Sequence, residues 1–128
     1  VMTMEAWIGE LHEEAILKKH GVEPGDLRRA VDSCEWLLYS LYEIAKLLGR
    51  SDLLTRISEL KERVRHGVKF ELLPLTALEG VGRIRSRSLY QAGFTDLSKL
   101  RNATLDRIAS VSKIGLALAR SLKEQVRN

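Results

Sequence analysis

The chain has 128 residues, of which 45% are hydrophobic and 30% are charged, and its formal net charge is +4. This composition is typical of a soluble globular protein with room for one ordinary domain or two small ones. The single cysteine, Cys34, excludes an internal disulfide and a zinc site built from cysteines, and it favours a reducing compartment. No apolar run approaches the roughly 18 residues that a membrane span needs, so we expect a cytoplasmic protein without a membrane partner.

The first half of the chain has helical periodicity, and strand alternation is almost absent throughout, so we expect an all-α fold. Thr3 is suited to cap a first helix over about residues 4–19, which Gly21 would end. A long helix is expected over about residues 26–48, and a third helix over about residues 51–66. Because the chain starts at Val rather than Met and ends abruptly, we expect a piece of a longer protein.

The second part of the chain is predicted to form short helices separated by glycine turns. Residues 68–78 are expected to form a short helix, which Pro74 would kink unless the proline lies in its first turn. Further helices are expected at about residues 83–92, 95–101, 104–111 and 115–127. Thr95 and Thr104 are suited to be N-caps of the second and third of these helices.

The change from long helices to short helices with glycine turns predicts a domain boundary near residues 67–76. We therefore expect two domains, a partial helical bundle over residues 1–70 and a helix-hairpin-helix module over residues 71–128. The first holds 11 Lys and Arg against 12 Asp and Glu, whereas the second holds 10 against 5. Two positive charges for each negative one are typical of a phosphate-binding surface, although a merely solvated basic surface has the same composition.

The long helix has two faces of different chemistry. Its core-facing stripe is predicted to consist of Leu27, Val31, Cys34, Leu38, Leu41, Ala45 and Leu48. Arg29 and Trp36 lie on the opposite face, two turns apart, with Ser33 and Ser40 beside the tryptophan. An exposed indole in line with a guanidinium is suited to stack on the bases of single-stranded nucleic acid. The alternative is that Trp36 packs under another helix, with Trp7 as its partner.

Two glycines in the second domain predict a helix-hairpin-helix turn. The run Leu78-Glu79-Gly80-Val81-Gly82 has the pattern apolar, any, Gly, apolar, Gly. Glycines permit a tight turn and let backbone N–H groups approach a phosphate, and the dipole of the following helix favours the anion. The candidate phosphate-binding residues are Gly80, Val81, Gly82, Arg83, Arg85 and Arg87. Because the three arginines alternate, they spread around their helix, and some of them can instead hold the two domains together.

A second, degenerate hairpin follows 33 residues later, in the run Val111-Ser112-Lys113-Ile114-Gly115, where Lys113 replaces the first glycine. The candidate phosphate-binding residues of this copy are Lys113, Gly115 and Arg120. Tandem hairpins of this kind resemble those of many DNA repair proteins. The alternative for both copies is a pair of glycine-capped helical turns without a ligand.

The sequence carries no recognisable catalytic motif. It has no glycine-rich loop followed by Lys-Ser or Lys-Thr that would bind ATP, and its three histidines are scattered, which favours capping or solvated roles. No carboxylate pair suggests general acid and base catalysis. We therefore expect no catalytic residue, no metal and no cofactor in this chain. A nuclease or glycosylase is not favoured, because the hairpins lack a carboxylate cluster or catalytic lysine.

Four spaced motifs extend over essentially the whole chain. They are Gly21-x-x-Pro24-Gly25-Asp26-Leu27-Arg28-Arg29, Glu35-Trp36-Leu37-Leu38, His66-Gly67-Val68-Lys69, and Gly82-Arg83-Ile84-Arg85-Ser86-Arg87-x-Leu89-Tyr90-x-Ala92-Gly93. In combination they resemble the last two domains of the archaeal superfamily-two DNA repair helicases of the Hjm family. The animal helicase HELQ and the helicase half of polymerase theta are related to this family.

The resemblance implies roles for five of the candidate residues. The long helix would be a ratchet helix that crosses the single-strand channel, with Arg29 and Trp36 stacked on successive bases. The final domain would grip the emerging strand and also restrain the motor, and its motif Arg-x-Arg-Ala-Arg corresponds to Arg83, Arg85 and Arg87. The chain departs from the family in two places, because Ser86 replaces the usual alanine and Pro74 interrupts a stretch that is normally helical.

The resemblance also implies a parent protein. That protein would be a monomeric helicase that uses ATP and magnesium, moves 3′ to 5′ and unwinds forked DNA at stalled replication forks. The partners implied for this region are single-stranded DNA, forked DNA and the motor domains of the same protein. The alternative function is that of an autoinhibitory or protein-interaction module that docks on those motor domains.

Overall fold

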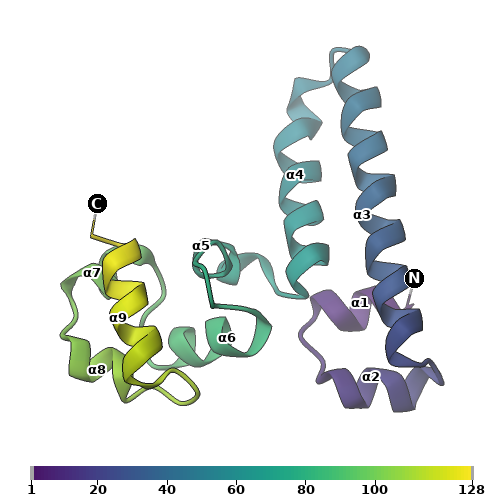
Figure 1. Cartoon of the computed structure of the whole chain (residues 1–128). Helices are drawn as coiled ribbons and strands as arrows, with labels where there is room; N and C mark the ends of the chain where they lie inside the picture. Colours follow the sequence, from purple (N-terminus) through teal and green to yellow (C-terminus); the bar gives the residue numbers. More distant parts are fainter. Residues whose placement is uncertain (1, 128) are drawn as a thin grey trace. The chain divides into compact units, whose positions relative to one another are not determined.

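The computed structural model describes residues 2–127, and Val1 and Asn128 lie outside the described residues. All regular secondary structure in this range is helical, which confirms the all-α fold. The chain divides into two compact units, Val1–Phe70 and Glu71–Asn128, which are described separately below (Figure 1). None of the helices formed by the described residues has the length and apolar character that a membrane span requires.

The first unit is built around a hairpin of two long helices (Figure 1). Its helices are α1 (Met2–Ile8), α2 (Glu13–His20), α3 (Pro24–Leu47) and α4 (Ser51–His66). α3 packs along α4, and α1 contacts α2, α3 and α4. The indole N–H of Trp7 donates to the carbonyl oxygen of Val64 at 2.6 Å, so α1 is held against the C-terminal end of α4.

The single first helix expected over residues 4–19 is wrong, because the chain breaks between α1 and α2. Glu10 adopts a left-handed conformation with φ 67°, and the amide of Leu11 donates to the carbonyl of Ala6 at 3.0 Å, which closes α1. His12 then caps α2, since its Nδ1 accepts a hydrogen bond from the amide of Glu14 at 3.3 Å. Apolar periodicity continues across this break, and glutamate rarely adopts a positive φ, so the sequence pattern predicts a continuous helix.

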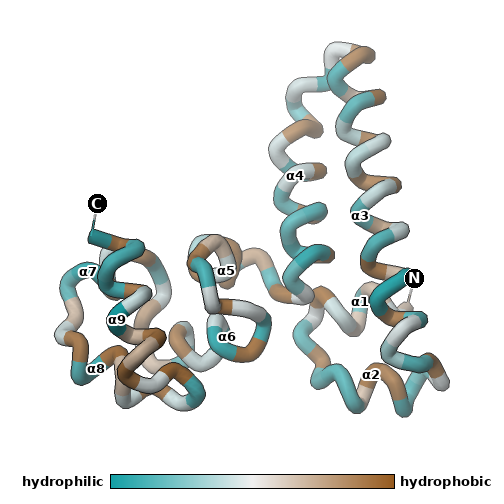
Figure 2. The backbone as a smooth tube through the Cα atoms, viewed as in Figure 1, coloured by the Kyte–Doolittle hydropathy of each residue, from teal (hydrophilic) through white to brown (hydrophobic). Residues whose placement is uncertain are grey.

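The core of the first unit is narrower than the stripe predicted on the long helix. Hydrophobic positions recur along the whole of α3 (Figure 2), but only some of them are covered. The buried residues of the unit's main cluster are Ile16, Leu27, Val31, Leu38, Ala45, Ile57 and Val64, and Cys34 is partly buried against them. Leu41 and Leu48, which were expected in the core, are 47% and 73% exposed. A contact between two helices covers only its seam, and these leucines lie about 55–75° around the helix from that seam.

The second unit consists of short helices. A 3-10 turn, η1 (Phe70–Leu72), leads into α5 (Leu73–Thr76), α6 (Arg83–Gln91), α7 (Leu97–Asn102), α8 (Leu105–Ala109) and α9 (Gly115–Gln125). α9 packs against α8 and α7, and α5 packs against α6. Leu89, Leu100, Ile108 and Leu122 are completely buried between these helices. Pro74 lies in the first turn of α5, where its missing N–H has no helical acceptor to lose, so it does not kink the helix.

Of the two N-caps predicted in the second unit, Thr104 is confirmed and Thr95 is wrong. Thr104 caps α8, as predicted, by accepting a hydrogen bond from the amide of Arg107 at 3.3 Å. The cap of α7 is Asp96 and not Thr95, because the carboxylate of Asp96 accepts from the amide of Lys99 at 2.9 Å. The hydroxyl of Thr95 instead accepts from the Lys99 ammonium group at 2.8 Å.

Candidate nucleic-acid interface

The two expected base-stacking residues lie on the solvent-exposed face of α3. Trp36 is 67% exposed, and Arg29 is exposed as well. They are seven positions apart in the sequence, which places them about 10 Å apart along the helix and in nearly the same direction. The tryptophan that packs on the core of this unit is Trp7. The alternative in which another helix of the first unit covers Trp36 is therefore excluded.

The start of α3 orients Arg29. Glu23 is the N-cap, and its amide donates to the Asp26 carboxylate at 3.2 Å, within a reciprocal capping box. The same carboxylate forms an ion pair with the Arg29 guanidinium. The hydrogen bond from the Glu23 backbone and then the Arg29 guanidinium hold the pKa of Asp26 below its ordinary value of 3.8. A phosphate that binds Arg29 must therefore compete with an exposed carboxylate.

Small and polar side chains leave the Trp36 ring open. A shallow hollow of about 460 Å³ lies beside it, lined also by Asp32, Ser33 and Leu37. The hydroxyl of Ser40 donates to the carbonyl oxygen of Trp36 at 3.1 Å, so this side chain is turned back to its own helix. An open indole face of this kind can stack on any of the bases.

The first hairpin connects α5 to α6, and its two glycines differ in what the fold demands of them. Gly80 has φ +85°, and a Cβ atom there would lie 2.8 Å from Cδ1 of Leu118. The backbone conformation therefore requires glycine at this position, and a larger residue would also displace the end of the Leu118 side chain. Gly82 has φ −105°, and a Cβ atom there would meet nothing within 4 Å. The space in front of Gly82 is open to an approaching ligand.

The helices that follow the two hairpins begin without side-chain caps. Gly82 and Ile114 are the N-caps of α6 and α9, and neither provides a side-chain hydrogen bond. In contrast, α7 and α8 are capped by side chains. The first N–H groups of an uncapped helix are available to solvent or to a ligand, and the positive end of the helix dipole lies at the same place. Both helix starts are therefore suited to an anion.

The second hairpin forms its turn although it lacks the first glycine. Lys113 occupies the left-handed region with φ 70°, which corresponds to the conformation of Gly80 in the first copy. The next residue, Ile114, is buried, and Gly115 also has a positive φ, of 73°. The degenerate copy therefore keeps a left-handed residue directly before the apolar residue of the turn.

Arg85 is already engaged in the second unit. Its Nε donates to the carbonyl oxygen of Lys113, and its Nη1 donates to that of Gly80, both at 3.0 Å. These bonds reach one residue in each hairpin. The expected role of Arg85 as a phosphate ligand stays a prediction.

The other two arginines of the motif also have partners within the protein. The Arg87 guanidinium pairs with the Glu71 carboxylate at 2.8 Å and lies 5.1 Å from the centroid of the Tyr90 ring. Arg83 likewise has an interaction partner. The hydroxyl of Ser86, which is buried, donates to the carbonyl oxygen of Arg83 at 3.1 Å. Serine in place of the usual alanine therefore leaves no unsatisfied hydroxyl group.

Comparison with known proteins assigns both parts of the chain. Residues 1–67 match the family described as archaeal helicase, domain 4, and residues 72–128 match the SAM-like helix-hairpin-helix tandem. The chain belongs to the archaeal helicase domain 4 family. The ATP-dependent DNA helicase Hel308 of Pyrococcus horikoshii is 43% identical over 122 residues, or 94% of this chain, and that of Pyrobaculum calidifontis is 44% identical over 123 residues, or 95%. The chain spans 17% of the length of each of these relatives.

In the helix-hairpin-helix tandem, Arg120 lies away from the first hairpin. It lies about 160° around α9 from Leu118, whose side chain lies close to Gly80 in space. Together with three other basic residues it lines a hollow of about 540 Å³, whose lining is Arg101, Leu105, Arg120, Lys123, Glu124 and Arg127. The Lys123 ammonium donates to the carbonyl oxygens of Arg101 and Ala103 at 2.8 and 2.7 Å, so part of this basic cluster holds the end of α7. The spacing of residues 120, 123 and 127 on one helix face is the only sequence signal of this cluster.

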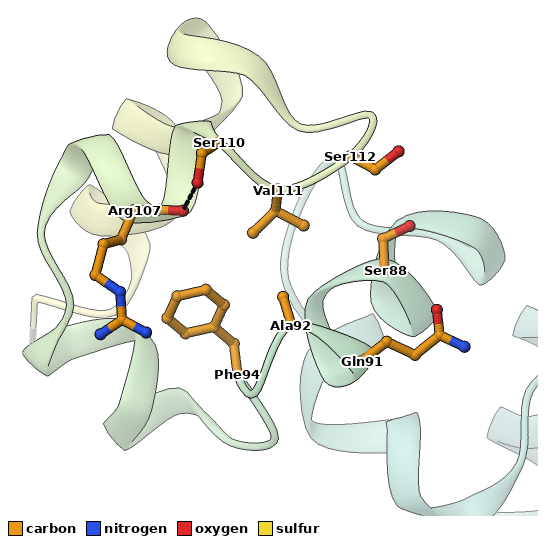
Figure 3. A pocket seen from close by; sticks show the side chains of 8 residues that line it. All are labelled: Ser88, Gln91, Ala92, Phe94, Arg107, Ser110, Val111 and Ser112. Atoms are coloured by element: carbon orange, nitrogen blue, oxygen red, sulfur yellow. Dashed lines mark hydrogen bonds between the residues drawn. The ribbon is translucent and has the colours of Figure 1, made fainter.

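Another hollow of the tandem lies between α6 and the segment that runs from α8 into the second hairpin (Figure 3). Its volume is about 430 Å³, and Phe94 points into it from the loop after α6. The Arg107 guanidinium lies 5.5 Å from the centroid of the Phe94 ring, and the Ser110 hydroxyl donates to the Arg107 carbonyl oxygen at 2.7 Å. Nothing in the sequence indicates this hollow, because its lining comes from separate segments.

Side chains that bind metals do not gather in the domain 4 region or in the tandem, as far as residues 2–127 are described. His12 caps α2, and His66 lies 3.4 Å from the Glu62 carboxylate on the preceding turn of α4.

Proposed function

We propose that this chain is the part of an ATP-dependent DNA helicase that binds single-stranded DNA, without preference for its sequence. The observation that carries the proposal is the shared exposed face of Arg29 and Trp36 on α3, in a family whose named relatives are DNA helicases. The indole stacks on a base, and the guanidinium contacts the next base or its phosphate. Since every base has a π-face, such contacts tolerate any sequence.

The helix-hairpin-helix tandem holds the DNA backbone in this proposal. The uncapped starts of α6 and α9 offer backbone N–H groups and the positive end of a helix dipole to phosphates. Contacts to phosphate position a strand but carry no sequence information. The tandem thus adds contacts to the DNA backbone, while α3 supplies the stacking on the bases.

The finer parts of the proposal concern the whole helicase. We infer a monomeric enzyme whose motor domains bind ATP and magnesium and move along DNA from 3′ to 5′, with forked DNA at stalled replication forks as the substrate. In that enzyme, α3 is the ratchet helix. The support is the resemblance of the four spaced motifs together with the matches to named DNA helicases.

A titration with fluorescent oligonucleotides tests the proposal. Single-stranded and forked DNA should both bind, more tightly at low salt than at high salt, because binding to phosphates releases counterions. Equal affinity for oligonucleotides of different sequence is expected. Affinity that is undetectable at low salt, or that resides in one particular sequence, would contradict the proposal.

A docking role has one specific observation in its favour. The side chains of Leu37, Leu41, Ile44 and Leu48 form an exposed apolar stripe on α3, next to the face that carries Trp36. Such stripes are typical of contacts with other protein surfaces. If the main role is docking on the motor domains, replacing Leu41 and Ile44 by serine should change the ATPase rate of the whole helicase in the absence of DNA. The single-strand affinity of this chain should then remain unchanged.

A further inference from the structure

One guanidinium joins the two hairpin turns. Arg85 donates from Nε to the Lys113 carbonyl oxygen and from Nη1 to the Gly80 carbonyl oxygen, each at 3.0 Å. Both acceptors belong to the left-handed residue of their turn, with φ +85° at Gly80 and 70° at Lys113. Arg85 therefore contacts the equivalent atom in each of two turns that lie 33 residues apart.

The second turn depends on outside support more than the first. A left-handed conformation is readily adopted by glycine but disfavoured for residues with a Cβ atom, and it persists only where the surroundings hold it. Lys113 is such a residue, and its carbonyl oxygen is the atom that Arg85 binds. The hydrogen bond from Arg85 is therefore placed where it would support a conformation that glycine adopts unaided.

Each of the two carbonyls lies within two residues of the N-cap of a helix. A trans peptide is planar, so the direction of the Lys113 carbonyl determines the direction of the Ile114 amide, and Ile114 is the N-cap of α9. In the first turn, the Gly80 carbonyl lies two residues before Gly82, the N-cap of α6. Holding both carbonyls on one planar guanidinium sets the two uncapped helix starts relative to each other.

We propose that Arg85 is a positioning residue, which ties the two hairpins together so that the starts of α6 and α9 receive phosphates of one DNA strand as a single site. It acts through the backbone of Gly80 and Lys113 and not as a phosphate ligand. This inference rests on the proposed DNA-binding function of the tandem, and it changes the role predicted for Arg85 from the sequence.

The test compares Arg85→Ala with the double variants Arg85→Ala/Lys113→Gly and Arg85→Ala/Lys113→Ala, all in the full chain. Arg85→Ala should weaken single-stranded DNA binding about 5- to 30-fold, the effect of losing one or two supporting interactions. Adding Lys113→Gly should restore affinity at least about fivefold, because glycine adopts the left-handed conformation without support. Adding Lys113→Ala, which removes the same charge but keeps a Cβ atom, should restore nothing.

If Arg85 is instead a direct phosphate ligand, adding Lys113→Gly to Arg85→Ala should lower the DNA affinity and not raise it. If Arg85 and Lys113 bind phosphate as charges, each double variant loses two charges and binds more weakly than Arg85→Ala. Arg85→Lys separates the cases again, because lysine keeps the charge but lacks the planar fork that reaches two carbonyls. Arg85→Lys should bind DNA as weakly as Arg85→Ala if Arg85 positions the turns. It should bind nearly as tightly as the unsubstituted chain if Arg85 is a phosphate ligand.

Amide hydrogen exchange gives a readout that needs no DNA. The Ile114 amide, which donates to the Val111 carbonyl at 3.1 Å, should exchange faster in Arg85→Ala and regain its protection in Arg85→Ala/Lys113→Gly. Unchanged exchange in Arg85→Ala, or a double variant weaker than Arg85→Ala, overturns the inference. If the chain without substitutions does not bind DNA, this result contradicts the proposed function and not the role of Arg85. The exchange measurement then still decides whether Arg85 holds the turn.

Discussion

Gly80 and Gly82 lie in the same turn, yet the fold demands glycine only at the first. Gly80 combines a positive φ with the close approach of Leu118, whereas Gly82 has neither constraint. A residue that the fold does not require to be glycine, but that leaves open space before an uncapped helix, is a candidate for a functional glycine. Substitutions at Gly80 should therefore affect mainly the stability of the fold, and substitutions at Gly82 mainly the binding of DNA.

Gly80→Ala should destabilise the second unit by about 1–3 kcal/mol, because alanine is strained at this φ and its Cβ atom meets Leu118. Gly82→Ala should change stability by less than about 0.5 kcal/mol, since its Cβ atom enters open space. Gly82→Ala should nevertheless weaken DNA binding, because the methyl group obstructs a phosphate. Thermal unfolding and DNA titration of both variants check these expectations, and normal affinity of Gly82→Ala would speak against the hairpin site.

Trp36→Ala should weaken single-stranded DNA binding by about 1–3 kcal/mol, the value of one stacked base, and should leave thermal stability nearly unchanged. Trp7 serves as an internal reference, because it packs on the core and donates its N–H to Val64. Fluorescence of the parent chain should be quenched by DNA, and that of Trp36→Phe should not. Leu48→Ala, which removes another exposed side chain from the end of α3, is the matched control with unchanged affinity.

Helix ends show how an element is set by one or two side chains. α3 starts with a reciprocal capping box of Glu23 and Asp26, α8 with Thr104, and α7 with Asp96. The carboxylate of Asp96 displaces the predicted cap Thr95, whose hydroxyl is engaged with Lys99. Both caps stand one residue apart, so only the geometry of the turn distinguishes them.

Asp96→Ala should destabilise the second unit by about 1 kcal/mol, since the amide of Lys99 loses its acceptor. Thr95→Ala, one residue away, removes only an exposed contact and should cost less than about 0.5 kcal/mol. Chemical denaturation of the two variants provides the comparison. Equal losses of stability would contradict the assignment of Asp96 as the cap.

The start of α3 should respond to pH. The pKa of Asp26 is lowered by its hydrogen bond to the Glu23 backbone and then by Arg29, so the folded state favours the carboxylate. The resulting stability is present above the ordinary pKa of 3.8 and is lost as the pH falls through the lowered value. An NMR titration of the Asp26 carboxyl group should therefore give a midpoint below 3.8, and Arg29→Ala should raise that midpoint.

For the whole molecule, the excess of positive charge and the exposed Trp36 belong to different units. The basic excess belongs to residues 71–128, whereas Trp36 belongs to a unit with nearly balanced charge. Salt screens contacts between cations and phosphates, but it has little effect on base stacking. Salt dependence therefore distinguishes the contributions of the two units.

The logarithm of the binding constant should fall linearly with the logarithm of the salt concentration, by about 0.7 for each phosphate neutralised on a single strand. Arg120→Ala should reduce this slope by about 0.7, because it removes one cation from the basic cluster. Trp36→Ala should lower the affinity at every salt concentration and leave the slope unchanged. If Arg120→Ala also lowers the affinity equally at every salt concentration and leaves the slope unchanged, Arg120 does not contact phosphate.

Local sequence patterns suffice for much of this protein. Helical periodicity predicts α3 and α4 and directs Trp36 away from the core, because the repeat of a helix depends only on residues three and four apart. The glycine spacing predicts the first hairpin for the same reason, since the conformation of a tight turn is a property of a few adjacent residues.

Tertiary contacts decide the remaining features. Leu41 and Leu48 belong to the apolar stripe, but the narrow seam with α4 leaves them uncovered, which depends on a second helix. The hydrogen bond from Arg85 to Lys113 joins residues that are 28 positions apart, so no short sequence pattern can predict it. Burial and long-range hydrogen bonds depend on which segments meet in space, and this information lies in the packing of the whole unit and not in any short stretch of the chain.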